Sequence, residues 1–191
     1  MASSRERPPT RTGRPYVALL RGINVGGKNL LPMLDLIALF DGAGCTNAQS
    51  YIQSGNIVFR ASPAVAARIP AVIAKAVTER FGFEAPVLVR SDEDLARVAK
   101  ENPFLGAGAD EALLHVAFLA ESPGAAQVAA LDAGRSPPDE FTVRGREIYL
   151  RCPNGMARTR LTNQYFDAKL STTSTMRNWR TVLKLLDMTR S

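Results

Sequence analysis

A glycine-rich, lysine-bearing loop is the part of this sequence whose residues best suit binding chemistry. The loop, Arg21–Asn29, reads RGINVGGKN and follows the apolar run Tyr16–Leu20, which has the composition of a buried strand. Glycines at the junction between a strand and a helix leave backbone N–H groups exposed, and such groups attract anions. The loop therefore predicts a site for a phosphate-bearing ligand.

The same loop comes close to the phosphate-binding motif of P-loop ATPases. Gly22, Gly27 and Lys28 have the spacing G-x-x-x-x-G-K, but Asn29 stands where that motif has the serine or threonine that holds Mg²⁺. Pro32 also places the start of the next helix beyond the lysine. We therefore do not expect an ATPase. The alternative is that the glycines only form a tight turn and Lys28 is solvated.

The elements that must position this loop follow from the hydrophobic periodicity. Strands are predicted at 16–20, 46–52, 56–60 and 85–90, and helices from Pro32 and over 64–80, the second of which Pro70 must kink or split. The order β-α-β-β-α-β is that of a ferredoxin-like domain.

A second polar turn, Gln53–Asn56, should lie next to the loop. In a βαββαβ domain, the loop after the first strand and the turn between the second and third strands emerge at the same edge of the sheet. The residues predicted to bind the ligand are therefore Arg21, Asn24, Gly26, Gly27, Lys28, Asn29, Gln53, Ser54 and Asn56. A turn this short also predicts a positive φ at Gly26 or Gly27.

This group offers many hydrogen-bond donors but no carboxylate or histidine. It suits recognition of a phosphate or a nucleobase, in a nucleotide or a nucleic acid, better than acid–base catalysis. One alternative is an enzyme that acts on a small anionic substrate at the same edge, with its general base supplied by the other half of the chain. Another is an interaction or assembly module in which both loops are rigid turns.

No metal or cofactor site is predicted. His115 is the sole histidine and lies in an apolar strand, and the only cysteines, Cys45 and Cys152, are far apart in the sequence. No apolar run approaches the ~18 residues of a membrane span, and the N-terminus lacks the hydrophobic centre of a secretory signal. We therefore expect a cytoplasmic protein without a membrane partner.

The second half of the chain repeats the pattern of the first. It has a strand at 112–119, a helix that starts at Ser122 and Pro123 and runs through Leu131, a hairpin with strands 139–143 and 147–151, a helix at 157–168 and a helical segment at 175–188. The prediction is an α+β fold of two ferredoxin-like lobes, the second degenerate with a short or missing last strand, plus a C-terminal helix. The predicted parts are a disordered basic tail (1–14), lobe 1 (15–90), a linking helix and loop (91–111), and lobe 2 with the C-terminal helix (112–191).

Positive charge is concentrated toward the C-terminus. The net charge is +6, and residues 144–191 hold ten basic and three acidic residues. Arg177, Arg180 and Lys184 recur at helical spacing and predict a secondary basic surface for phosphates, while Trp179 falls on the apolar face. The simpler interpretation is a solvated helix face.

Three motifs, RGINVGGKN, YIQSGN and MRNWRT, resemble those of a bacterial family catalogued as domain of unknown function 1697. The resemblance covers residues 15–188. It implies a two-lobed α+β protein of ferredoxin-like parts with no established activity. Family members usually show a Ser-Lys-Leu-like stretch where this chain has Thr159, Arg160 and Leu161, so a role for a titratable lysine is not carried over.

Overall fold

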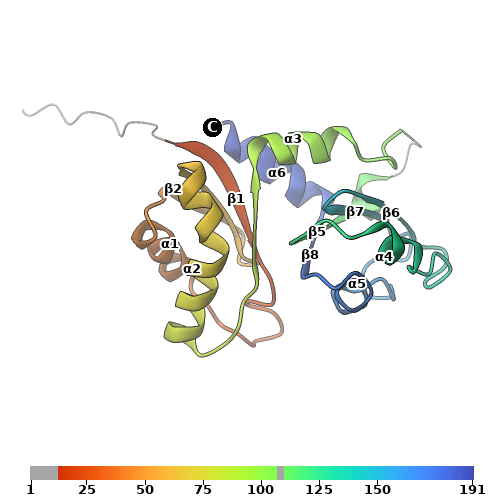
Figure 1. Ribbon diagram of the computed structural model, residues 1–191, viewed down its shortest axis with the longest axis horizontal. Helices are drawn as coiled ribbons and strands as arrows, with labels where there is room; N and C mark the ends of the chain where they lie inside the picture. Colours follow the sequence, from red (N-terminus) through yellow and green to blue (C-terminus); the bar gives the residue numbers. More distant parts are fainter. Residues whose placement is uncertain (1–12, 107–109) are drawn as a thin grey trace, which may run out of the picture.

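A computed structural model describes residues 13–106 and 110–191, which form two antiparallel four-stranded sheets with helices (Figure 1). Most of the predicted basic tail therefore lies outside the described residues. The first lobe consists of β1 (Arg14–Leu20), α1 (Met33–Gly42), β2 (Thr46–Tyr51), β3 (Asn56–Ala61), α2 (Pro63–Phe81) and β4 (Val87–Ser91). Its strand order, β2-β3-β1-β4, confirms the ferredoxin-like prediction.

Local sequence signals explain where the helices of lobe 1 begin. Pro32 precedes α1, and Ser62 caps α2 by accepting a hydrogen bond from the Val65 N–H. Of the two outcomes expected at Pro70, a kink or a split, the split does not occur, because α2 continues through the proline. Ile69 and Ile73 are buried on either side of the proline, and this packing outweighs the missing backbone hydrogen bond.

The second lobe has every element of the first. Helix α3 (Asp92–Lys100) and the short 3-10 helix η1 (Glu111–Leu113) lead into it. Its elements are β5 (Leu114–Leu119), α4 (Ala125–Ala129), β6 (Glu140–Arg144), β7 (Glu147–Arg151), α5 (Asn163–Leu170), β8 (Ser174–Asn178) and α6 (Trp179–Thr189). The order β6-β7-β5-β8 is the same arrangement.

The last strand corrects the predicted helix over 175–188. Ser174–Asn178 pairs with β5, and helix α6 begins only at Trp179, where the Asn178 side chain accepts the Thr181 N–H at 2.8 Å. The helix predicted at 157–168 likewise begins later, at Asn163, after the capping residue Thr162.

The two lobes share part of their hydrophobic core. Strand β1 sends Ala18 and Leu20 toward α1 and α2 and sends Val17 and Leu19 to the opposite face. That opposite face packs with α3, α6 and the second sheet in one continuous cluster, in which Trp179 is buried as expected. Helices α3 and α6 thus lie between the sheets (Figure 1).

Candidate functional site

The glycine-rich loop and the hairpin turn lie together, as the topology predicts. The Leu20 N–H donates to the Gly55 carbonyl at 2.7 Å, and Asn24 Nδ2 donates to the Gln53 carbonyl at 3.0 Å. Gly26 and Gly27 have φ values of 58° and 73°, which confirms the predicted positive φ. The Lys28 N–H closes this turn on the Val25 carbonyl at 3.0 Å.

Most of the polar side chains in the two turns bond to the protein itself. Asn24 Nδ2 donates to the Leu31 carbonyl at 2.9 Å, and its Oδ1 accepts the Leu31 N–H at 2.8 Å. Asn29 Nδ2 donates to the Gly22 carbonyl at 2.8 Å. These contacts favour the interpretation that the asparagines stabilise the loop. Lys28 and Gln53 remain exposed.

Three arginines join the lobes, and Arg21 is the first. Its guanidinium forms an ion pair with Asp167 and donates to the Ser174 carbonyl at 2.9 Å. Asp167 is held in turn by the Ser174 N–H at 2.8 Å. Arg21 therefore contributes to the lobe interface, with its side chain directed to α5 and β8.

Arg177, expected on a basic surface, is the second inter-lobe arginine and corrects that part of the prediction. It lies on β8 with 8% of its surface exposed, because the helix that would have turned it outward begins two residues later. Its Nε donates to Asn56 Oδ1 and its Nη2 to the Leu20 carbonyl, both at 2.6 Å. Burial lowers its pKa to about 10. Asn56, which also donates to Ser54 Oγ at 2.9 Å, is thus fully engaged.

The two other residues of the predicted basic surface lie on α6. Arg180 and Lys184 are both exposed, and Lys184 pairs with Asp187 at 2.9 Å.

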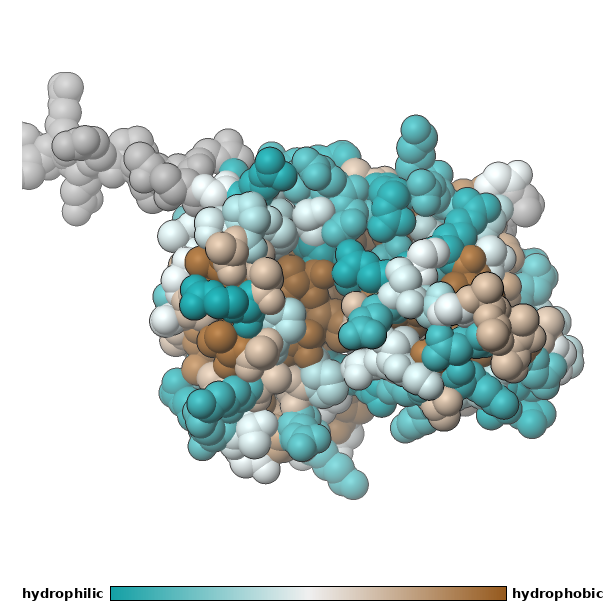
Figure 2. Space-filling model, in the orientation of Figure 1, coloured by the Kyte–Doolittle hydropathy of each residue, from teal (hydrophilic) through white to brown (hydrophobic). Residues whose placement is uncertain are grey.

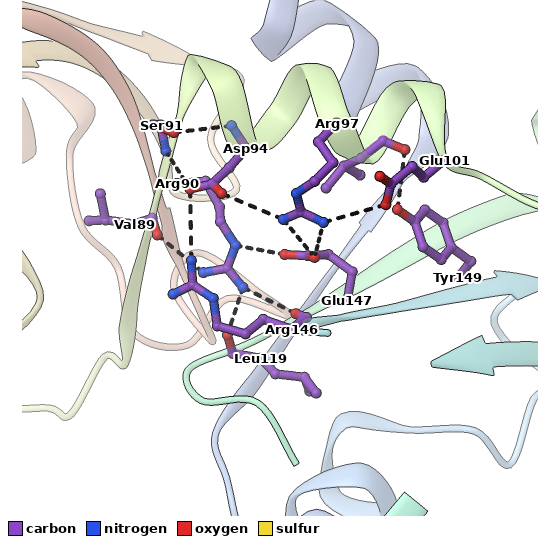
Figure 3. A network of polar contacts seen from close by, with 11 residues as sticks. Val89, Arg90, Ser91, Asp94, Arg97, Glu101, Leu119, Arg146, Glu147 and Tyr149 are labelled. Carbon is purple, nitrogen blue, oxygen red and sulfur yellow. Dashed lines mark hydrogen bonds and ion pairs between the residues drawn. The ribbon is translucent and has the colours of Figure 1, made fainter. Parts of the chain in front are cut away.

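Arg90 is the third inter-lobe arginine and the centre of a buried network (Figure 3). Its Nε donates to Glu147 Oε1 at 2.9 Å, and its Nη2 donates to the Leu119 carbonyl at 2.7 Å. Arg97 donates twice to Glu147 Oε2 at 3.1 Å. Burial, with a smaller effect of the nearby Arg146 cation, lowers the pKa of Arg90, while Glu147 opposes the shift. The network fixes β4 of lobe 1 against β7 of lobe 2.

A cleft of about 430 cubic ångströms lies between the lobes beside this network. Figure 2 shows apolar surface there, bordered by hydrophilic side chains. The apolar lining comes mostly from β1, α2 and β4 and includes Ala120 after β5; its residues are Tyr16, Pro63, Ala66, Ala67, Pro70, Val87, Leu88, Val89 and Ala120. The polar lining includes Arg90, Glu121 and Arg146. A cavity of this size, mostly apolar with a few polar groups, is typical of small-molecule sites.

Arg146 is the cation at this cleft that is available to a ligand. Arg90 is saturated by Glu147 and three carbonyls, whereas among the described residues the Arg146 guanidinium has a single distant ion pair, 3.7 Å from Asp94, and 38% of its side chain is exposed. An arginine fork in this state can bind a phosphate or carboxylate bidentately.

The open edge of β4 adds backbone groups to the cleft. β4 is an edge strand, and the Arg21 N–H bonds to the Pro86 carbonyl at 3.0 Å. Because antiparallel residues alternate, Val87 and Val89 must direct their N–H and C=O groups away from β1. All four of these groups are therefore directed to the open edge. The Val89 carbonyl accepts from Arg90 at 3.1 Å, which leaves the Val89 N–H and both Val87 groups for a ligand.

Sequence reasoning missed this cleft because its lining comes from segments far apart in the chain. The one cleft residue that a local pattern marks is Arg146, which lies in the turn between the predicted strands 139–143 and 147–151. Across the described ranges, no three His, Cys, Asp or Glu side chains gather as metal ligands would. Nor is any helix there long and apolar enough to cross a bilayer.

Comparison with known proteins defines the family but no activity. The chain is similar in structure to the conserved bacterial protein SP0830 from Streptococcus pneumoniae, with a TM-score of 0.69 and 23% sequence identity over 92% of this chain and 98% of the other. No curated protein matches it. The model of the family described as "Protein of unknown function (DUF1697)" matches residues 14–149, and the chain therefore belongs to that family.

Proposed function

We propose that this is a cytoplasmic binding protein for a phosphate-bearing small molecule of nucleotide size, held in the inter-lobe cleft. The observation that carries the proposal is the Arg146 guanidinium, which lies at an apolar cleft and has only one, distant counter-ion in the part of the chain that the structure describes. A phosphate group would replace the solvent on this guanidinium with two parallel charge-assisted hydrogen bonds.

The rest of the cleft suits the organic part of such a ligand. Ala67 and Pro70 of α2 and Leu88 of β4 give an apolar wall on which a planar base or another apolar group would pack. The Val89 N–H and the two Val87 backbone groups, directed to the open strand edge, would hydrogen-bond a base along its edge. This division, in which apolar walls supply area and a few polar groups fix orientation, is common in ligand pockets.

The glycine-rich loop supports a second location for the same kind of ligand. Gly26 and Gly27 are exposed and in the left-handed conformation, and Lys28 is exposed beside them. A phosphate, or the backbone of a nucleic acid, would there contact backbone amides and one lysine. The cleft offers apolar walls as well as a cation, so we place the ligand in the cleft.

Isothermal titration with nucleoside mono- and triphosphates and with inorganic phosphate tests the proposal. Arg146→Gln removes the cation, and Ala67→Trp fills the cleft from an exposed position on α2. Each should weaken nucleotide binding by about tenfold or more, since this corresponds to losing roughly 1.4 kcal/mol.

Two matched variants separate the locations. Ala71→Trp places the same side chain one turn further along α2, at an exposed position outside the cleft lining, and Lys28→Gln alters the loop. Both should bind like the wild type. Loss of binding in Lys28→Gln alone would move the site to the loop, and no binding of any nucleotide by the wild type would overturn the proposal.

A further inference from the structure

A second cleft, of about 390 cubic ångströms, lies in lobe 2 where β5, β8 and α6 meet. It shares none of its described lining residues with the inter-lobe cleft. Its lining is mostly polar and consists of Glu111, Ala112, His115, Asn178, Arg180 and Leu183. The sole histidine of the chain and an arginine of the predicted basic surface are therefore brought to one cavity.

The backbone places three donor side chains together at this cleft. His115 on β5 is the register partner of Asn178 at the end of β8, and Arg180 follows in the first turn of α6. Asn178 uses its Oδ1 to accept the Thr181 N–H, which leaves its Nδ2 as a donor. Among residues 13–106 and 110–191, none forms an ion pair or hydrogen bond with the Arg180 guanidinium.

The histidine has one ring nitrogen to offer. Its Nδ1 is buried and has no hydrogen-bond partner of normal geometry among the described residues, so a ligand in the cleft would bond to Nε2. Glu111 is the one carboxylate among the described residues that line the cleft. A guanidinium, an amide N–H₂ and an imidazole around one cavity suit a tetrahedral oxyanion, whose several acceptor oxygens can bond to all three.

We propose that His115, Asn178 and Arg180 form a second anion site, which binds the phosphate group of inorganic phosphate or of a phosphate monoester. Glu111 on η1 opposes the anion, and Arg180 on α6 favours it. Protonation of His115 adds a positive charge, so binding strengthens as pH falls, and by linkage the bound anion raises the pKa of His115.

Proton NMR gives a direct test, because the only histidine of the chain yields a single Hε1 signal. Inorganic phosphate and phenyl phosphate, each titrated into the wild type in a non-coordinating buffer, should shift this signal saturably and raise its apparent pKa. The tighter of the two distinguishes free phosphate from a monoester. A control titration with chloride at equal ionic strength should not reproduce the shift.

Variants chosen to keep the fold make the test specific. Arg180→Gln should weaken binding by about tenfold or more, since an arginine–phosphate contact is lost. Asn178→Asp retains a good helix cap but replaces the donor with a negative charge, and should abolish binding. Glu111→Gln should tighten it.

Two further variants should leave the response unchanged. Lys184→Gln alters another exposed cation of α6, and Arg146→Gln alters only the inter-lobe cleft. The proposal fails if the Hε1 signal does not respond to either phosphate, or if Arg180→Gln responds as the wild type does.

Discussion

Arg177 Nε donates to Asn56 Oδ1 at 2.6 Å, a contact between residues 121 positions apart in the chain. Asn56 holds the hairpin turn of lobe 1 by donating to the Tyr51 carbonyl and to Ser54 Oγ, at 3.2 and 2.9 Å. The arginine thus connects the last strand of lobe 2 to the turn and to the end of β1. Two motifs that suggested ligand binding, YIQSGN and MRNWRT, bind each other.

Replacing this arginine should therefore destabilise the whole chain. Arg177→Met keeps the length of the side chain but leaves Asn56 Oδ1 and the Leu20 carbonyl without their donor. The expected loss in the free energy of unfolding is about 3 kcal/mol or more, since each buried unsatisfied group costs roughly 1–3 kcal/mol. Urea denaturation measures it, with Arg180→Met as the exposed control, expected within about 0.5 kcal/mol of the wild type. Equal midpoints for the two variants would contradict the structural role.

The buried pair Arg90–Glu147 should show strong coupling. Glu147→Leu leaves the buried Arg90 cation without a carboxylate, at a cost of about 3–5 kcal/mol, whereas Arg90→Met leaves the buried Glu147 with Arg97 as its remaining partner and should cost less. The double variant removes both charges and should lose much less than the sum of the single variants. A double-mutant cycle by chemical denaturation gives the coupling energy, and additive losses would show that the two side chains act independently.

Two glycines with similar φ values should respond very differently to alanine. At Gly55 a Cβ would lie 2.8 Å from the Leu20 Cβ, whereas at Gly26 it would meet nothing within 4 Å. Gly26→Ala should therefore cost only the left-handed conformation, about 1–2 kcal/mol, and Gly55→Ala should cost clearly more. Thermal melts of the two variants side by side provide the comparison, and a smaller effect at Gly55 would be inconsistent with the close packing of the two loops.

Acid should weaken the fold through His115. Burial holds the pKa of this histidine below its ordinary value of 6.5, so the unfolded chain binds a proton at a pH where the folded chain does not. Stability must then fall as pH drops from about 6.5 toward the lower folded pKa. His115→Gln removes this contribution, and its denaturation midpoint should vary less between about pH 7.5 and 5.5 in phosphate-free buffer. An unchanged pH profile in the variant would contradict the prediction.

The fold was readable from local signals, whereas the roles of the arginines were not. Pro32, the turn at Gln53–Asn56 and the apolar alternation in β1 act over a few residues, so they specify the order of elements. Nothing in the sequence around Arg177 marks it as buried, and its spacing to Arg180 and Lys184 fits the exposed face of a helix. Only the pairing of β8 with β5 turns it inward, and that pairing joins distant segments.

The candidate sites show the same division. The adjacency of the two loops and the positive φ of Gly26 and Gly27 follow from topology and turn chemistry. The inter-lobe cleft does not, because it depends on how one lobe packs on the other through Arg90 and Glu147. A buried ion pair between residues 57 positions apart leaves no periodic signal in the sequence.

The shared core also imposes an order on events during protein synthesis. β4 completes the first sheet at Ser91, but the face that carries Val17 and Leu19 packs against α6, which is translated only after the entire second sheet. At ordinary elongation rates this interval is roughly 5–20 seconds. Throughout it, the part of this apolar face that α6 covers stays exposed, although α3 is already synthesised. A ribosome that stalls within lobe 2 would therefore hold a substrate for chaperones rather than a finished domain.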